Sequence, residues 1–439
     1  MDKLFTSESV ALGHPDRMAD TIGNAILTDI LKHDKNAHVG IEALLTKNFL
    51  VLSGEVSSTY YPDYEKIARE TVREIGYTKP EYGFCFDTFQ FINKVNSQSP
   101  DIAQGVNREN GVIGAGDQGI IFGFAVNETE NLYPLAATIA NALTTRYQEF
   151  IKGDANFRPD AKSQVTINYS QGTIDTIVFA ASHNESVSTE YIEKTIKENV
   201  IYPVLKELVE DSAIKDVKIL INATGKFVIC GPEGDAGVIG RKLVVDSYGG
   251  YGKIGGGCTN AKDPSKVDAS AARAARHAAK NLVAAEICEA CEIQLSYAIG
   301  VAKPVSISVD TFGTGVISDV EIAEILADNY DFSPAAIIKN LHLCDADYKV
   351  ITSTGQFGQV SSTKVVDGET VYLYPWEELN LVEDFKKLFV SNGSSNEEQV
   401  SDEVAQKVEV PAESSNEEKS ASKGKGKKEE KPDISPSAK

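Results

Sequence analysis

The stretch Gly255–Asp268 constrains this chain most, because it combines backbone freedom with dense charge. Three consecutive glycines open it, and residues without a Cβ atom let a backbone approach a bulky ligand closely. Lys262 and Lys266 then supply positive charge, and Asp268 supplies a carboxylate suited to a hard metal ion. A helix rich in alanine and arginine is predicted to follow over Val267–Cys288. The stretch therefore predicts a site for a polyphosphate held with magnesium.

The overall composition excludes several classes of protein. With 439 residues, of which 42% are hydrophobic, the chain is expected to form two or three domains plus an extra segment. A formal net charge of −21 argues against general nucleic-acid binding, although it leaves room for a local cationic pocket. No apolar run approaches the roughly 20 residues needed to cross a membrane, and the N-terminus lacks the apolar core of a signal peptide. The six scattered cysteines indicate a reducing compartment, so we expect a cytoplasmic protein. From the net charge and the short apolar runs we expect neither nucleic-acid nor membrane partners.

Hydrophobic patterning predicts helices and strands in recurring groups. Helices are expected at 13–30, 64–75, 134–152, 189–209, 267–288, 319–326 and 333–341, the last two ending the ordered part. Strands are expected within 1–12 and at 48–56, 84–92, 120–126, 163–169, 173–181, 218–222, 226–229, 294–300 and 305–310. This grouping favours repeated α/β layers over a single parallel sheet.

Two segments are predicted to lie outside the regular elements. Residues 96–116 are polar and punctuated by glycine, which is typical of a mobile lid or binding loop. After about residue 391, Ser, Glu and Lys dominate, and the sequence of 394–398 recurs at 414–418. Such a tail cannot bury enough apolar surface to fold, so 391–439 is predicted to be disordered. A solubilising role is favoured for it, with weak partner binding as the alternative.

The predicted helix start at Gly13-His14-Pro15-Asp16 is a candidate anion site. Proline suits the first turn of a helix, and Asp16 suits its positive end. Arg17 is expected to add positive charge there. The alternative, which these residues alone favour, is a structural helix cap.

Further glycine turns carry charged residues. Gly114–Gly119 encloses Asp117 but does not fit the dinucleotide fingerprint, and a tight turn is the alternative. Basic residues accompany the segments Arg158–Lys162 and Gly231–Lys242, where solvated surface charge is the alternative. Phe227 could stack on a base, although its spacing alone favours core packing.

No nucleophile–base pair stands out in the sequence. The other histidines, at 33, 38, 183, 277 and 342, lack the context of a catalytic triad. Cys288 and Cys291 are placed in a helical stretch, where buried apolar cysteine is favoured over a redox or zinc pair. The inventory therefore favours charge stabilisation over proton transfer.

Taken together, these motifs resemble those of the S-adenosylmethionine synthetases, also called methionine adenosyltransferases. The resemblance spans about residues 3–385 in order and leaves the tail outside. The segments that carry it are Ser7–Val10 with Gly13–Asp16, Gly114–Gly119, Arg158–Gln164, Gly231–Lys242, Gly255–Gly257 with Lys262–Asp268, and Ser296–Gly300.

The resemblance implies synthesis of S-adenosylmethionine from ATP and L-methionine. The methionine sulfur attacks the ribose 5′ carbon and expels triphosphate, which water then cleaves to pyrophosphate and phosphate. A thioether sulfur carries no proton, so this reaction needs positioning and charge stabilisation more than a general base.

The resemblance also implies roles for individual residues. Catalysis is assigned to His14, Lys162, Arg241, Lys262 and Asp117. ATP binding is assigned to His14, Asp160, Lys162, Lys226, Phe227, Asp235, Arg241, Lys242, Cys258 and Lys262. Methionine binding is assigned to Glu55, Gln98, Asp235 and Lys266, and 98–108 resembles a mobile gate. Asp16 and Asp268 would hold two Mg²⁺ ions per site, and Glu42 would support K⁺.

The fold implied by the resemblance has three similar α/β domains around a pseudo-threefold axis. The segments are 1–12 with 128–230 for the N-terminal domain, 13–101 with 231–269 for the central domain, and 105–127 with 270–385 for the C-terminal domain. A homodimer or homotetramer is implied, with sites at the subunit interface.

Several positions depart from the family pattern. Arg17 stands in place of a lysine, Lys226 in place of an arginine, and Ala269 in place of an arginine. Cys258-Thr259-Asn260-Ala261 replaces the usual Ala-Phe-Ser-Gly. Every charge assigned to the phosphates remains, which favours an active enzyme over an inactive assembly subunit. A different ATP-dependent kinase or ligase is the other alternative, and it would release ADP or AMP.

Overall fold

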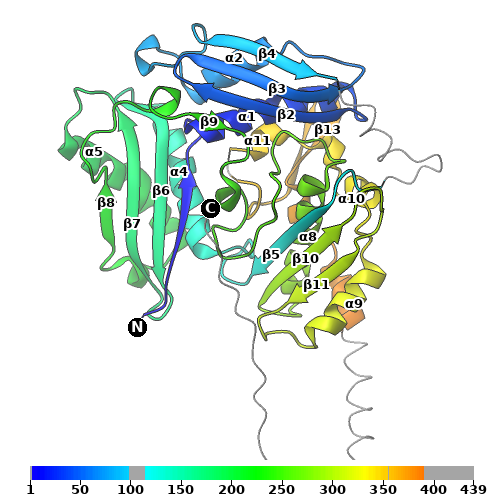
Figure 1. Cartoon of the computed structure of the whole chain (residues 1–439). Helices are drawn as coiled ribbons and strands as arrows, with labels where there is room; N and C mark the ends of the chain where they lie inside the picture. Colours follow the sequence, from blue (N-terminus) through cyan, green and yellow to red (C-terminus); the bar gives the residue numbers. More distant parts are fainter. Residues whose placement is uncertain (1, 98–113, 354, 390–439) are drawn as a thin grey trace, which may run out of the picture. The chain divides into compact units, whose positions relative to one another are not determined.

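The computed structural model describes residues 2–97, 114–353 and 355–389 and shows a mixed α/β fold (Figure 1). The described strands form several sheets, as predicted, rather than one parallel sheet. The predicted gate, with Gln98, and the predicted disordered tail lie outside the described residues.

The first sheet has the strand order β1-β6-β7-β8 and is antiparallel except for the β7–β8 pair. Its strands are β1 (Leu4–Val10), β6 (Phe157–Asn168), β7 (Thr173–His183) and β8 (Lys218–Ile221). Helix α4 (Leu135–Phe150) packs against β1 and β6, and its buried Leu143 and Tyr147 share a core with Val165 and Phe179.

The helix predicted over 189–209 contains a π-helical turn. It is divided into α5 (Thr189–Ile196), the π segment η2 (Lys197–Ile201) and α6 (Tyr202–Leu208). Pro203 has no N–H to donate to the carbonyl of Asn199 four residues earlier. The Asn199 carbonyl instead accepts a hydrogen bond from Arg146 Nε of α4 at 3.1 Å. The proline therefore explains the local change of helix type.

The second sheet has the order β4-β3-β2-β9. Its strands are β2 (His38–Thr46), β3 (Phe49–Ser57), β4 (Gln90–Asn96) and β9 (Gly237–Val238). The strand predicted at 84–92 is wrong in position, because Phe84 and Phe89 stack on each other in the core instead of alternating across a strand. The strand β2 was not among the predicted elements.

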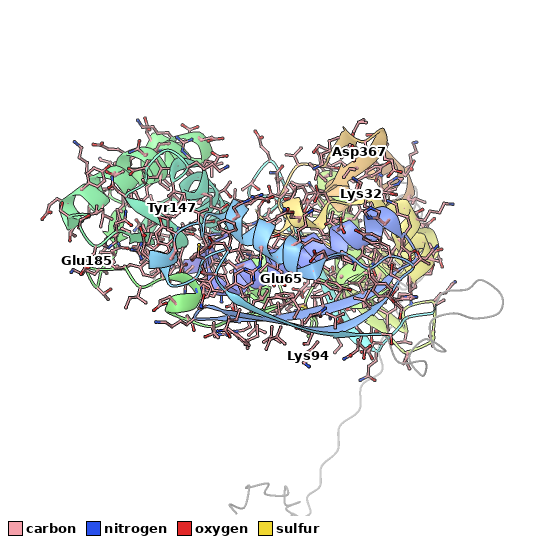
Figure 2. All side chains as sticks on the ribbon, turned by 90° about the horizontal axis from the view of Figure 1, so that it is seen from above. Lys32, Glu65, Lys94, Tyr147, Glu185 and Asp367 are labelled. Carbon is pink, nitrogen blue, oxygen red and sulfur yellow. The ribbon has the colours of Figure 1, made fainter. Side chains whose placement is uncertain are left out.

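Helices α1 (Pro15–His33) and α2 (Tyr64–Ile75) pack against each other, and α1 also packs against β2 and β9. Their predicted positions are confirmed. At the far end of α1, Lys32 donates a hydrogen bond to Asp367 at 2.6 Å, and Figure 2 shows the two labels close together. This ion pair is exposed, so it contributes little to stability.

The third sheet has the order β11-β10-β5 and is covered by α8 (Val267–Ala284). Its strands are β5 (Gly119–Val126), β10 (Ala290–Tyr297) and β11 (Ser306–Asp310). An added Cβ at Gly123 would lie 2.1 Å from the carbonyl carbon of Ala275, so helix and strand are in close contact there. This contact explains the small residues of α8. The helix ends at Ala284, so the helical placement of Cys288 and Cys291 was wrong, although both are buried and free.

The described chain continues past the helices α9 (Asp319–Asn329) and α10 (Pro334–Asn340), so the prediction that these end the ordered part was wrong. The remaining elements include α7 (Leu243–Asp246), α11 (Tyr348–Ile351), β12 (Ser362–Val366) and β13 (Glu369–Leu373), with 3-10 turns η1 (Pro80–Tyr82), η3 (Asp211–Ile214), η4 (Gly231–Glu233), η5 (Leu343–Asp345) and η6 (Pro375–Glu377). Glu377 in η6 is fully buried and pairs with Arg276 at 2.9 Å and Lys280 at 2.8 Å on α8. These buried ion pairs tie the late segment to the core.

Each of the three larger sheets combines strands that are far apart in the sequence. The boundaries of the three domains stay a prediction. Among the described helices, none is both long enough and apolar enough to cross a membrane.

Candidate active site

The first turn of α1 carries His14 as its N-cap and Pro15 at the first helical position. His14 Nδ1 accepts a hydrogen bond from the Asp16 backbone N–H at 3.2 Å. Burial, followed by the charges of Lys242 and Lys162, lowers the pKa of His14 to about 3. The ring is therefore neutral near pH 7. Because Nδ1 accepts a hydrogen bond, the proton of the neutral ring lies on Nε2.

Asp16 is only 1% exposed, and its carboxylate accepts hydrogen bonds from several donors. Its Oδ1 accepts the Val238 N–H at 2.9 Å, and its Oδ2 accepts Lys242 Nζ at 2.6 Å. Arg241 Nε lies 3.6 Å from Oδ1. Burial alone would raise the pKa of Asp16, but the hydrogen bonds from Lys242 and Val238 outweigh it and the pKa is lowered. Asp16 is therefore an ionised carboxylate.

Strand β9, shortly before Arg241, lies close to the start of α1 because it begins with glycine. An added Cβ at Gly237 would lie 2.2 Å from the Pro15 carbonyl. Lys162 on the neighbouring β6 is exposed and acts electrostatically on His14. The structure thus gathers five predicted residues, which we call the α1 cluster: His14, Asp16, Lys162, Arg241 and Lys242.

Asp160, two residues before Lys162 on β6, has an unusual environment. Its Oδ2 accepts the Gly231 N–H at 2.8 Å, whereas its buried Oδ1 has no hydrogen-bond partner among the described residues. Burial raises the pKa of Asp160 to about 7, against the lowering effects of the Gly231 hydrogen bond and Lys162. A buried polar atom without a partner is a candidate contact for a ligand.

Phe227 lies in irregular backbone, so the strand predicted at 226–229 is not formed. His183 holds this backbone with two hydrogen bonds. Its ring Nε2 accepts the Phe227 backbone N–H at 3.0 Å, and the His183 backbone N–H donates to the Phe227 carbonyl at 3.0 Å. The Phe227 side chain is only partly buried. Lys226 and Asp235 are exposed, and Lys226 lies 3.7 Å from Glu185.

A second group gathers at the first turn of α8. Lys262 Nζ donates to Asp268 Oδ2 at 2.7 Å. The third glycine of the motif lies against this carboxylate, since an added Cβ at Gly257 would lie 2.1 Å from the Asp268 carboxyl carbon and would displace that side chain. Burial alone would lower the pKa of Lys262, but Cys258, Asp268 and Glu42 together raise it. We call Glu42, Cys258, Lys262 and Asp268 the α8 cluster.

The other members of this cluster are shifted by burial. Burial raises the pKa of Cys258 to about 11, so its side chain is a thiol at neutral pH. Burial also raises the pKa of Glu42, while Lys262 lowers it. Glu42 is exposed to solvent from the open face of β2, so the effect of burial on it is modest.

Of the residues predicted to bind methionine, Glu55 and Lys266 lie near the α8 cluster, and Gln98 lies outside the described residues. Gly40 pairs with Glu55 of β3 on one side and bridges to Lys262 on the other. Lys266 donates to the buried Asp263 at 2.5 Å. Asp117 is exposed in the turn before β5, where its carboxylate accepts the Gln118 N–H at 2.8 Å.

Arg17 adds positive charge at the helix start, as predicted, because its charge helps to lower the pKa of His14, but its side chain is buried. Its guanidinium is 2% exposed and donates to Asp246 at 2.5 Å and to Asp20 at 3.5 Å. Asp246, Asp20 and Asn24 were missed by sequence reasoning. One signal was available, because Asp16, Asp20 and Asn24 recur every four residues and so share a face of α1.

The carboxylates of the two clusters suit a magnesium site that substrate and water complete, and not a site in which protein side chains supply all the ligands. Among the described residues, no group of three or more His, Cys, Asp or Glu side chains is placed to hold a metal. Magnesium is typically bound by one or two carboxylates, with substrate phosphates and water as the remaining ligands. Asp16 and Asp268, each beside lysines, suit that mode.

Family models match most of the chain in three blocks. They describe the N-terminal domain of S-adenosylmethionine synthetase at residues 2–100, its central domain at 112–227 and its C-terminal domain at 229–366. The chain belongs to the S-adenosylmethionine synthetase family. It is a methionine adenosyltransferase, which makes S-adenosylmethionine from ATP and methionine.

The blocks of the synthetase family model do not coincide with the sheets. Strand β1 lies in the first block but pairs with β6 of the second. Strand β9 lies in the third block but pairs with β2 of the first. Residues of the α1 cluster accordingly come from all three blocks of this synthetase.

Proposed function

We propose that the α1 and α8 clusters bind the triphosphate of ATP and carry the adenosyl transfer. The observation that supports this most strongly is a repeated arrangement. Asp16 and Asp268 are each the second residue of a long buried helix, and each accepts a hydrogen bond from a lysine. A helix start with nearby cations attracts phosphate oxygens.

In this proposal His14 acts as a neutral hydrogen-bond donor. Its Nδ1 is engaged by the Asp16 N–H, so the Nε2 proton is available to the oxygen that leaves the ribose 5′ carbon. The methionine sulfur attacks that carbon from the opposite side, and the triphosphate departs. Proton transfer is not required, because a thioether has no proton to lose.

The cations are proposed to stabilise the departing triphosphate and to hold it for hydrolysis. Lys242 and Lys262 now pair with carboxylates, and phosphate oxygens would take the place of those carboxylates. Lys162 and Arg241 are exposed beside them. Asp16 and Asp268 would hold two Mg²⁺ ions, which when bound add positive charge to the phosphate oxygens.

Nucleoside and methionine are proposed to lie on either side of the breaking bond. The nucleoside would contact Asp160 Oδ1, which has no partner in the described part of the chain, together with the partly exposed Phe227 ring, Lys226 and Cys258. Methionine would contact Glu55, Asp235, Lys266 and Gln98, with Asp117 between it and the ribose. Glu42 would support K⁺ through its exposed carboxylate.

We also propose a homodimer or homotetramer with sites at the subunit interface, and a cytoplasmic location. The first rests on the family assignment. The second is supported by the six free cysteines, four of which are buried.

The direct test mixes purified protein with ATP, methionine and Mg²⁺ and follows S-adenosylmethionine, pyrophosphate and phosphate. All three should form together, whereas release of ADP or AMP would contradict the proposal. Replacing Lys262 by alanine should lower turnover by about 10²–10³, because a cation that faces the leaving charge is lost. Near-normal turnover of Lys262→Ala would refute its role.

A further inference from the structure

Ala261, directly before Lys262, has a backbone conformation that disfavours its side chain. Its φ is +57°, in the left-handed region where glycine is the usual residue. Its position is the one at which the family pattern ends in glycine, as noted above. An added Cβ at Gly23 of α1 would lie 2.6 Å from the Ala261 Cβ, so that helix residue has to be glycine to admit the methyl group.

The strained backbone of Ala261 is held on both sides. Its N–H donates to Asn24 Oδ1 at 2.6 Å, and its carbonyl accepts the Ile41 N–H at 3.0 Å. Asn24 is fully buried on α1, and Ile41 belongs to β2. The strain therefore persists because neighbouring elements fix the peptide groups around it.

Asn260 fixes Asn24 in turn. Its Oδ1 accepts Asn24 Nδ2 at 2.9 Å and Gln356 Nε2 at 2.8 Å, and its Nδ2 donates to Asp246 at 2.8 Å. The amide of Asn260 has no exposed surface, so these three bonds satisfy it within the protein. The side chains of residues 24 and 260 thus form one unit around the peptide of residue 261.

This unit connects the two clusters. The Asp246 carboxylate accepts hydrogen bonds from the Asn260 amide and from the guanidinium of Arg17, the residue that follows Asp16. Its own N–H donates to the Lys242 carbonyl at 2.8 Å. A continuous chain of buried hydrogen bonds therefore runs from the α1 cluster to the backbone that carries Lys262.

We propose that Asn24 and Asn260 are positioning residues that hold Ala261 in its left-handed conformation and thereby place Lys262 at the triphosphate. This inference rests on the proposed role of Lys262. Without the two amides the backbone at residue 261 relaxes, and the cation leaves its place opposite the leaving group.

The test compares Asn260→Ala, Ala261→Gly and the double variant. Asn260→Ala should lower kcat by at least about ten-fold, because small misplacement of a charge-stabilising group is costly, while the KM for methionine stays within about two-fold. Glycine adopts a left-handed backbone without a Cβ penalty, so adding Ala261→Gly should restore a large part of the lost kcat.

Asn281→Ala is the matched control. Asn281 is equally buried and makes three hydrogen bonds, but it binds the 377–381 segment at the other end of α8. This control should lower the melting temperature and leave kcat within about two-fold, and Ala261→Gly should not change its kcat. If Asn260→Ala does not fold, Asn260→Ser serves in its place, with the same split between kcat and the methionine KM and the same rescue expected.

Two outcomes overturn the inference: a kcat for the Asn260 variant that matches the Asn281 control, or no recovery in the double variant. Lys262→Ala is measured in parallel to separate the two proposals. Normal turnover of that variant would refute the role of Lys262 itself. A large loss in Lys262→Ala with none in Asn260→Ala would refute only the positioning by the buried amides.

Discussion

Helices α1 and α8 both begin with an aspartate that pairs with a lysine, but the two aspartates are buried to different extents. Asp16 and Asp268 both stand second in their helix, and both accept a lysine hydrogen bond, at 2.6 and 2.7 Å. The Asp16 side chain is 1% exposed and also accepts a backbone N–H, whereas the Asp268 side chain is 27% exposed.

This difference indicates that the two halves of the proposed phosphate site play unequal parts. A buried carboxylate is fixed by its donors, and removing its charge leaves a cation without its partner in a poorly solvated place. A carboxylate that is about one quarter exposed can reorient, and water can replace any hydrogen-bond partner that it loses. We therefore regard the α1 cluster as the rigid half and the α8 cluster as the adjustable half.

The largest effect is expected for Asp16→Asn. This change should lower turnover by about 10²–10³ and also lower the melting temperature, because Lys242 loses its buried partner. Steady-state kinetics at saturating Mg²⁺ and a thermal melt check both parts. A smaller loss than in Asp268→Asn would break the comparison.

Asp268→Asn should act mainly on magnesium. We expect the Mg²⁺ concentration for half-maximal activity to rise by about ten-fold or more, with stability nearly unchanged, because a partly exposed ion pair contributes roughly 0–1 kcal/mol. Activity is titrated with Mg²⁺ at fixed ATP. An unchanged titration curve would count against Asp268 as a ligand.

Asp160 sharpens the comparison, because it is as buried as Asp16 but lacks a lysine hydrogen bond. Its pKa is raised to about 7 from an ordinary value near 3.8. Protonation therefore favours the folded state, and this contribution to stability is lost as pH rises from about 4 to about 7.

Asp160→Asn removes this pH dependence. The melting temperature of the variant minus that of the wild type should rise between pH 5 and pH 8. The corresponding change in the difference between their unfolding free energies is on the order of a few kcal/mol at most. Thermal melts of the ligand-free proteins at several pH values measure the difference. A constant difference would show that Asp160 stays ionised throughout.

The smallest effect is expected from deleting residues 391–439, which lie outside both clusters and outside the family match. Turnover and the Mg²⁺ titration should stay within about two-fold of the full chain. A large loss would mean that the tail is more than a solubilising extension.

Much of the fold could be predicted where apolar spacing is regular. Helices α1, α2 and α4 lie within a few residues of their predicted positions. The prediction failed where context overrides pattern: Phe84 and Phe89 look like strand residues but pack as a stacked pair, and the helix predicted over 189–209 contains a π-helical turn before Pro203.

For the candidate site, sequence reasoning found the charged residues but not their supports. The motifs placed Asp16, Lys242, Lys262 and Asp268 in one site, which stays a prediction; in the structure they form two pairs, one in each cluster. The buried links through Asp246 and Asn260 were invisible, because polar residues are normally expected at the surface. The burial of Arg17 was not predicted for the same reason, since it depends on the partner that folding brings to it.

The pairing of β1 with β6 has a consequence for how the chain is made. Val10 lies opposite Lys162, so about 150 residues must be synthesised before the first strand has a partner. At roughly 5–20 residues per second, the N-terminal strand waits on the order of 8–30 s on the ribosome with its hydrogen-bonding edges open. Since that strand leads directly into His14 and Asp16, the start of the proposed catalytic helix is among the first parts to be synthesised, but the strand before it gains a partner only after β6 has been made.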